Sequence, residues 1–204
     1  MSEFPRLDPD DLPDDAVVLV RQWLDVAAAD DGVNDPRVAS LATADADGLP
    51  DVRTVIVREV SDQGLLFTTT YTSAKAEQMD GQGAAALLLF WEPLMRQCRI
   101  RGTVRRMAAE EADERFARFD RDRQIMAWAS DQRSELADRA ALERAFEAAA
   151  ERFPDDVPRP DHFGGYRLRP EDVEIWQGHP VDRLHDRFRY RRQGEGWSLA
   201  RIAP

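Results

Sequence analysis

Two short polar turns separate three apolar segments in the first third of the chain, and they constrain the fold more than any other feature. The segments span residues 37–43, 52–60 and 65–70 and are rich in Val, Ile, Leu and Thr. The turns at 45–48 and 61–64 read DADG and SDQG, which is typical of hairpin turns. Strands joined by so few residues must be antiparallel, because a parallel crossover needs about a dozen residues or more. The sequence therefore predicts an antiparallel meander or barrel.

Further strand and helix patterns follow along the chain. We expect strands at residues 84–91, 96–107, 166–169, 173–177, 182–190 and 197–202. The spacing of apolar residues predicts helices over 17–27 and 73–80 and a helical insert over 109–153, which the following prolines end. The predicted fold class is mainly β with α additions. Residues 1–15 are an acidic lead-in that we expect to be flexible, and residues 16–204 are expected to form a single domain.

Composition narrows the possible partners and the compartment. The 204 residues carry 28 Lys and Arg against 39 Asp and Glu, a net charge of −11, which argues against nucleic acid or an anionic membrane as the main partner. A single cysteine allows no internal disulfide. No apolar run approaches the roughly 20 residues of a membrane span, so we expect a cytoplasmic protein. The three histidines lack metal-ligand spacing, and no metal site is expected.

Three polar side chains would share one face of the strand expected at 182–190. If that segment is extended, its period of two places Arg183, His185 and Arg187 on the same side. Such a surface is unusual for a strand that only covers a core, and it suits an anionic ligand.

The only lysine, Lys75, lies where an expected strand leads into an expected helix. Free backbone N–H groups and the positive end of a helix favour a phosphate group there, and the hydroxyls of Thr68, Thr69 and Ser73 add donors. An ordinary capped helix after a threonine-rich strand is the alternative. Arg53 and Arg58 flank a very apolar strand, and they need anionic partners unless both reach water from the strand ends.

Two glutamines and a tryptophan are candidates for contact with a planar ring. Amides such as those of Gln97 and Gln132 suit a flavin, whose pyrimidine edge alternates donors and acceptors. Either glutamine is equally compatible with a plain surface position. Trp176 ends an expected strand and is either a core residue or one wall of a cofactor site.

Taken together in this order, these segments resemble the pyridoxamine 5′-phosphate oxidase family. The resemblance runs from about residue 35 to residue 204, and its motifs are RTVIVR at 53–58, TTTYTSAK at 68–75, RQ at 96–97, AWAS-x-Q at 127–132, WQG at 176–178, RLHDR at 183–187 and the closing RIAP. It implies an FMN-binding split β-barrel, which is an antiparallel Greek-key barrel with surrounding helices. It also implies a homodimer that holds FMN at the subunit interface.

The resemblance assigns roles residue by residue. The FMN phosphate would meet Arg53, Lys75, Thr69 and Ser73, and the rest of the cofactor would meet Thr68, Gln97, Gln132, Trp176 and Arg187. The cofactor site would also include Thr54, Val55, Ile56, Val57, Arg58 and Arg133. Arg183 and His185 would be the catalytic residues that bind and orient the substrate, with Arg58 beside them. The implied reaction transfers a hydride from pyridoxamine or pyridoxine 5′-phosphate to the flavin, and dioxygen is then reduced to hydrogen peroxide.

Three departures from the family pattern leave the substrate open. Where the family has Tyr, Arg and Ser at four-residue spacing, this chain has Arg115, Phe119 and Arg123. We interpret Arg115 and Arg123 as substrate ligands, either in a rebuilt phosphate clamp or in a pocket for a planar carboxylate such as a dihydrophenazine acid. Arg58 replaces a lysine, and Arg133 replaces a small hydroxyl residue. The alternatives are a flavin oxidase of another small anionic aromatic substrate, a non-catalytic flavin or pyridoxal-phosphate binding protein, and a deazaflavin in place of FMN.

Overall fold

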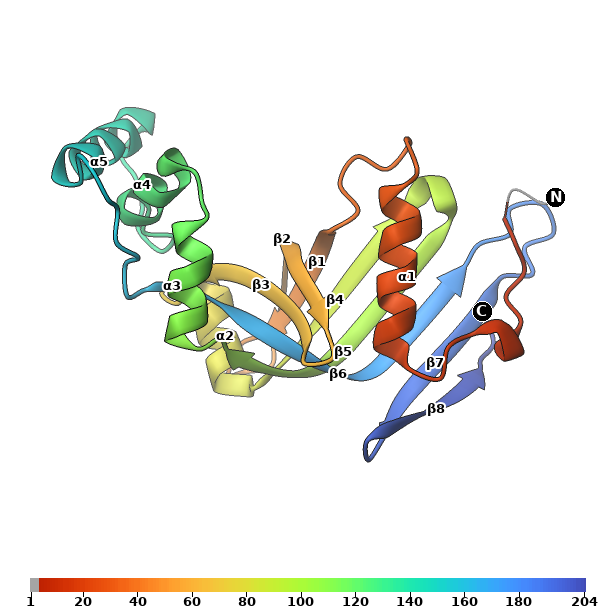
Figure 1. Ribbon diagram of the computed structural model, residues 1–204. Coiled ribbons are helices and arrows are strands. Elements are labelled where there is room, and N and C mark those ends of the chain that lie inside the picture. Colours follow the sequence, from red (N-terminus) through yellow and green to blue (C-terminus); the bar gives the residue numbers. More distant parts are fainter. Residues whose placement is uncertain (1–3) are drawn as a thin grey trace.

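A computed structural model describes residues 4–204 (Figure 1). Its helices are α1 (Ala16–Ala28), α2 (Ala74–Gln82), α3 (Ala109–Ala117), α4 (Arg121–Ala129) and α5 (Arg139–Arg152), with short 3-10 turns at Pro9–Asp11 and Glu92–Leu94. Its strands are β1 (Val38–Ala44), β2 (Pro50–Ser61), β3 (Gly64–Thr70), β4 (Ala84–Trp91), β5 (Arg96–Arg106), β6 (Phe163–Gln177), β7 (Asp186–Gln193) and β8 (Gly196–Arg201). None of the helices among the described residues is long and apolar enough to cross a membrane.

The strands form one antiparallel sheet that closes into a barrel. Their order is β3-β2-β1-β4-β5-β6-β7-β8, and an additional pairing of β3 with β6 closes the ring from β3 to β6. The hairpin β1–β2–β3 followed by β4 beside β1 is a Greek key. β7 and β8 continue from β6 beyond the closed barrel. The predicted mainly β fold with a split barrel and added helices is confirmed.

One long strand replaces two that the sequence predicts separately. Residues 166–169 and 173–177 both belong to β6, and Pro170 lies inside it. Gly102 of β5 is opposite Pro170 while Arg101 is opposite Asp172, so one extra residue bulges out of β6 at this point. A proline fits at a bulge because no ladder hydrogen bond is required there.

The bulge brings the backbones of β5 and β6 so close that Gly102 has no room for a side chain. A Cβ atom there would lie 1.8 Å from the carbonyl oxygen of Arg169. We expect Gly102→Ala to destabilise the fold by about 3 kcal/mol, which lowers the melting temperature by about 6–12 °C. Gly81→Ala is the matched control, because nothing lies within 4 Å of its Cβ position and alanine favours the helix. Equal melting temperatures for the two variants would contradict this packing.

Helix α1 forms where the sequence predicts it and covers one face of the sheet (Figure 1). Asp15 caps its N-terminus by accepting a hydrogen bond of 2.6 Å from the Val17 N–H. Its buried stripe packs on the strands and includes Ala16, Leu19, Val20, Trp23, Leu24 and Ala27. The other face of β5, β6 and β7 is not covered by α1, and it carries the polar residues described below.

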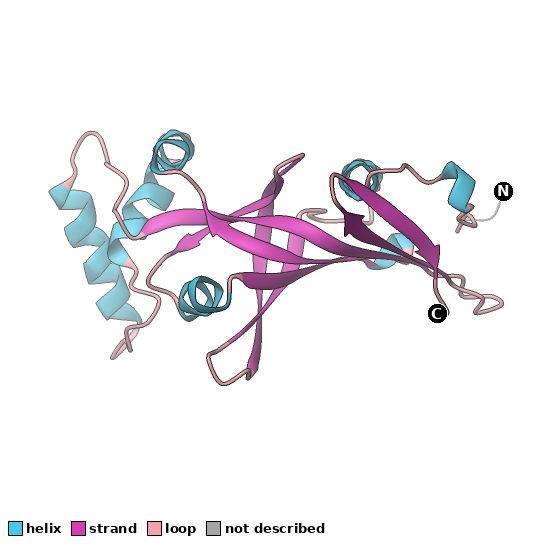
Figure 2. Cartoon of the chain, turned by 90° about the horizontal axis from the view of Figure 1, so that it is seen from below, coloured by secondary structure: helices cyan, strands magenta, loops and turns pink. Residues whose placement is uncertain are grey.

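The helical insert predicted over 109–153 is present and lies at one end of the molecule, with the β7–β8 hairpin at the other (Figures 1 and 2). It has a small core of its own around Phe116 and Ile125, which contacts Phe163 at the start of β6. The insert is therefore docked on the barrel through β6.

Residues 4–15 lie against the C-terminal part of the fold. Leu7 and Leu12 pack on the core, and the Tyr190 hydroxyl donates a hydrogen bond of 2.9 Å to the carbonyl of Pro13. These packing partners are not apparent from the acidic composition that led us to expect a flexible segment over residues 1–15. Residues 1–3 lie outside the described part of the chain.

Candidate functional site

Two cations from different elements lie close together at the start of α2. Arg53 of β2 donates to the Thr43 hydroxyl at 2.5 Å and to the Gln78 side chain at 3.3 Å, and it also pairs with Asp51. The pKa of Lys75 lies below its ordinary value because the side chain is half buried and because Arg53 repels it. Two cations held close enough to repel one another form a site that favours a bound anion.

The start of α2 differs from an ordinary capped helix. Ser73 is the N-cap residue, but its side chain makes no capping hydrogen bond in the part of the chain that the structure describes. Its hydroxyl donates instead to the Thr70 carbonyl at 2.8 Å. The Thr70 hydroxyl is buried without a partner among residues 4–204. Open N–H groups, a buried hydroxyl and Lys75 together fit a phosphate group.

The segment after α4 closes over this site. Gln132 accepts a hydrogen bond of 2.9 Å from Lys75, and Arg133 forms an ion pair with Glu77 of α2. Both residues therefore lie beside the cationic pair, although Arg133 is committed to a carboxylate of the same chain.

A second pair of cations lies between β2 and α4. The pKa of Arg123 is below its ordinary value because of burial and because of repulsion from Arg58. The guanidinium of Arg123 stacks on the Phe119 ring with its central carbon 3.6 Å from the ring centre. The Nε atom of Arg58 is buried and has no hydrogen-bond partner among the described residues. This pair is a second candidate anion site.

Arg115 does not join that pair, which corrects the expectation that Arg115 and Arg123 act together. Arg115 forms ion pairs with Glu59 and Glu111. The physical reason is a break in the helix: α3 ends at Ala117, and Asp120 caps a new helix by accepting a hydrogen bond of 2.9 Å from the Arg123 N–H. The four-residue spacing therefore does not place the side chains on one helical face.

Gln97, Trp176 and Arg187 form a row across three neighbouring strands. Gln97 of β5 is opposite Trp176 of β6, which in turn is opposite Arg187 of β7. Residues directly opposite each other point to the same face, and this is the face that α1 leaves uncovered. Arg187 donates to Glu174 and to the Ala203 carbonyl, both at 2.9 Å. The row presents an amide, an indole ring and a guanidinium on one face of the sheet, groups that suit contact with a planar ring.

The strand expected at 182–190 is wrong in its first four residues. β7 begins at Asp186, and residues 178–185 form a loop in which Arg183 has a φ of +60°. The Asp182 side chain accepts a hydrogen bond of 3.0 Å from the Leu184 N–H and thereby stabilises a turn in place of the extended chain. Arg183, His185 and Arg187 therefore do not share a strand face.

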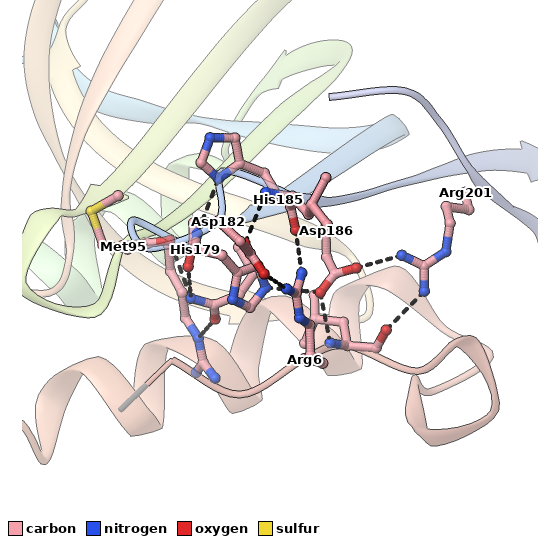
Figure 3. A network of polar contacts seen from close by, with 12 residues as sticks. Arg6, Met95, His179, Asp182, His185, Asp186 and Arg201 are labelled. Carbon is pink, nitrogen blue, oxygen red and sulfur yellow. Dashed lines mark hydrogen bonds and ion pairs between the residues drawn. The ribbon is translucent and has the colours of Figure 1, made fainter. Parts of the chain in front are cut away.

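The loop nevertheless brings His185 to Trp176 of the row, and Figure 3 shows His185 beside His179 and Asp186. The His185 ring packs on Trp176 with centroids 4.9 Å apart, and its Nδ1 accepts a hydrogen bond of 3.0 Å from the His179 N–H. Arg6 pairs with Asp182 and donates to the Leu184 carbonyl, so a residue near the N-terminus holds this loop near the C-terminus. The Arg183 side chain is exposed at its tip.

The remaining predicted cofactor residues have less direct roles. Val55 and Val57 are core residues, so only their backbone is available to a ligand. Thr54 is exposed and Ile56 is half buried on the opposite side of β2. Thr68 is half buried in β3, whereas Thr69 is buried.

Two polar residues around the site were missed by sequence reasoning. Thr43 and Gln78 contact Arg53. Gln78 follows Lys75 by three residues and so lies on the same face of α2, which is a signal that could have found it. The position of Thr43 depends on the β1–β2 register, and the sequence alone does not fix that register.

The site residues fall into two groups within one chain. The α2 group contains Arg53, Lys75, Arg58, Arg123 and Gln132. The β6–β7 group contains Gln97, Trp176, Arg187 and the 178–185 loop. Among residues 4–204, no hydrogen bond or ion pair joins the two groups. The β6–β7 group lies on the sheet face that α1 leaves open.

Comparisons with known proteins identify the family of the chain. Residues 26–153 match the family model described as pyridoxamine 5′-phosphate oxidase, and residues 163–204 match the pyridoxine 5′-phosphate oxidase C-terminal dimerisation region. The chain is 43% identical to the pyridoxine/pyridoxamine 5′-phosphate oxidase of Salinibacter ruber, over 99% of this chain and 96% of the relative. The corresponding protein of Pseudomonas paraeruginosa is 41% identical, over 94% and 90% of the two chains.

A solved structure similar to this chain is PhzG from Burkholderia lata 383, in complex with tetrahydrophenazine-1-carboxylic acid. It has a TM-score of 0.90 and 32% sequence identity, and the match covers 100% of both chains. The dimerisation region at 163–204 supports assembly as a homodimer, and it contains the β6–β7 group. With both family models matched in sequence order and the split barrel formed, the chain belongs to the pyridoxamine 5′-phosphate oxidase family of oxidoreductases.

Proposed function

We propose that the protein is an FMN-dependent oxidase that converts pyridoxamine or pyridoxine 5′-phosphate to pyridoxal 5′-phosphate. The observation that carries the proposal is the presence of two separate groups of cations. Arg53 and Lys75 contact side chains around the uncapped start of α2, and Arg123 stacks on Phe119 while the buried Nε of Arg58 has no partner among the described residues. The reaction requires two phosphates in one site, one on the cofactor and one on the substrate. Relatives of about 40% identity that are named for this activity support the same assignment.

The residues present fit FMN. Arg53, Lys75 and the uncapped start of α2 would hold its phosphate, and Gln132 would lie beside it. Gln97, Trp176 and Arg187 would face the ring system. Because no hydrogen bond or ion pair joins these groups among residues 4–204 and one of them lies in the dimerisation region, we propose that FMN lies at the interface of the homodimer and that each subunit contributes one group.

FMN would supply the redox chemistry, accepting a hydride from the C4′ carbon of the substrate and returning two electrons to dioxygen to form hydrogen peroxide. For pyridoxamine 5′-phosphate, water then releases ammonia and leaves the aldehyde. The chain's own residues bind and orient. Arg58 and Arg123 would neutralise the substrate phosphate, Arg183 would stabilise negative charge at the substrate, and His185 would orient its ring.

A second candidate function follows from the Arg123 guanidinium, which stacks on Phe119, and from Arg58, the second cation of that pair. Planar guanidinium groups bind carboxylates in a bidentate manner, and the PhzG structure holds an aromatic carboxylic acid. The alternative is therefore an oxidase of a small aromatic carboxylate.

Anaerobic titration of the yellow holoenzyme separates the two functions. Pyridoxamine 5′-phosphate is expected to bleach the flavin stoichiometrically, and a dihydrophenazine carboxylic acid is the competing substrate. The spectrum before titration also distinguishes FMN from a deazaflavin. Bleaching by the carboxylate alone would establish the second function, and inertness toward both would contradict each of them.

Arg123→Met tests the substrate-anion site. Loss of one charged hydrogen-bond donor is expected to raise the KM for pyridoxamine 5′-phosphate about 10- to 100-fold with little change in kcat. Arg144→Met is the matched control, because Arg144 lies exposed on α5 of the same insert. An unchanged KM in Arg123→Met would remove Arg123 from the site.

A further inference from the structure

A buried histidine–carboxylate pair lies next to His185 and has no part in the chemistry proposed above. The Nε2 atom of His179 lies 3.0 Å from the Asp186 carboxylate, and the two side chains are 7% and 6% exposed. Burial alone would raise the pKa of Asp186, but the Leu7 N–H, Arg201 and His179 hold it below its ordinary value. The carboxylate is therefore charged, and the His179 Nε2–H donates to it.

The backbone of the same histidine determines the state of His185 (Figure 3). The His179 N–H donates to the Nδ1 atom of His185 at 3.0 Å. A backbone N–H can only donate, so Nδ1 must carry a lone pair, and the neutral ring must carry its proton on Nε2. His185 consequently presents a hydrogen-bond donor on its outer edge and has no free base there.

We propose that His179 is a positioning residue: its buried bond to Asp186 fixes its backbone N–H against His185 and thereby holds His185 as the Nε2–H tautomer, a donor to an acceptor atom on the aromatic substrate. The proposal rests on the proposed function, because it takes His185 as a substrate contact. It adds that His185 takes up no proton from the substrate.

The loop around His179 shows why the side chain is needed. The Gly178 N–H donates to the Met95 carbonyl at 2.7 Å, and the Arg183 N–H donates to the His179 carbonyl at 2.9 Å. These bonds act near the two ends of the loop, and the β6–β7 ladder pairs Gln177 with Asp186 at its base. The His179 imidazole adds a side-chain bond from inside the loop to Asp186, which Arg201 also holds. Without the imidazole this bond is lost, and the His179 N–H is free to shift relative to His185.

Nitrogen NMR of the ¹⁵N-labelled holoenzyme tests the tautomer directly. The chain has three histidines, and the imidazole signals that disappear in His185→Gln are those of His185. In the unchanged protein we expect protonated Nε2 and unprotonated Nδ1 at His185. His179→Ala is expected to give a mixture of His185 tautomers. Flavin reduction should slow about 10-fold, because the hydrogen bond from His185 to the substrate is weakened and both of its partners are uncharged. The Kd for FMN should stay unchanged.

His179→Gln is the rescue variant, because its amide nitrogen can replace Nε2 as the donor to Asp186. It is expected to restore both the tautomer and the rate. If His179→Ala fails to fold, His179→Asn takes its place, since the shorter amide cannot reach the carboxylate. A single Nε2–H tautomer and a full rate in the disrupted variant would overturn the proposal, as would failure of His179→Gln to restore them.

Tyr190→Phe controls for a general loss of stability. Tyr190 lies on β7, as Asp186 does, and the substitution removes its 2.9 Å hydrogen bond to the Pro13 carbonyl. That bond does not involve His185, so we expect the tautomer of His185 and the rate of flavin reduction to stay unchanged. A tautomer mixture in this control would overturn the specific role of His179. The NMR measurement needs no turnover, so failure of the proposed substrate and failure of the positioning role give different results.

Discussion

Replacement of Lys75 by methionine is expected to weaken FMN binding about 10- to 100-fold, because a charged hydrogen bond to the phosphate is lost. Lys75 is half buried beside Arg53, and Gln132 already orients its ammonium group. Methionine preserves the length of the side chain, so the fold should be unchanged. Flavin fluorescence during titration of the apoprotein with FMN measures the Kd.

The pH dependence of binding gives a second readout for the same residue. The pKa of Lys75 lies below its ordinary 10.5 through burial and the repulsion from Arg53. A bound phosphate favours the charged form and raises this pKa again, so FMN binding takes up protons in the alkaline range. The Kd is expected to rise as the pH increases through the lowered pKa of the free site. In Lys75→Met this part of the pH dependence should disappear.

Arg106→Met is the matched control for both measurements. Arg106 is a cation at the end of β5 that pairs with Asp80 near the other end of α2. Its loss should leave the Kd and its pH dependence as they are. An equal loss of affinity in both variants would show that overall charge, and no specific phosphate site, determines FMN binding.

The barrel could be predicted from the sequence because its turns are local. Residues 61–64 form a hairpin in which Ser61 is opposite Gly64, and such a turn permits only antiparallel strands. The union of two predicted strands into β6 could not be foreseen in the same way. Pro170 normally argues against a central strand, and it is tolerated only because the partner strand has Gly102 at the bulge.

The candidate site was predictable in its members but not in its contacts. Arg53 and Lys75 are 22 positions apart, and they come together only because α2 packs beside β1 and its Gln78 accepts a hydrogen bond from Arg53 of β2. The helix break before Asp120 moves Arg115 away from Arg123, and a four-residue spacing cannot reveal such a break. The turn at Asp182 likewise depends on one side-chain bond to the Leu184 N–H. These are tertiary or single-bond effects that residue periodicity does not contain.

Arg183→Ala is expected to lower the rate of flavin reduction about 100-fold, because the substrate is no longer held in position for hydride transfer. The yellow colour and the Kd for FMN should stay unchanged, because Arg183 lies in the loop and the phosphate site lies on α2. Arg191→Ala removes an exposed arginine of β7 and should have no effect on the rate. Loss of the colour with an unchanged rate per bound flavin would reverse the roles of the two sites.

The backbone at Arg183 provides a further test of its role in the same variant series. Its φ of +60° lies in the left-handed region, which costs a non-glycine residue about 1–2 kcal/mol. Arg183→Gly should therefore relieve strain and raise the melting temperature by about 2–4 °C, whereas Arg183→Ala keeps the strain. Both variants lose the guanidinium and should be equally slow in flavin reduction. A glycine variant that is more stable and yet inactive would show that the fold tolerates this strain in order to hold Arg183 at the substrate. A glycine variant with a lower melting temperature than the alanine variant would contradict the left-handed conformation itself.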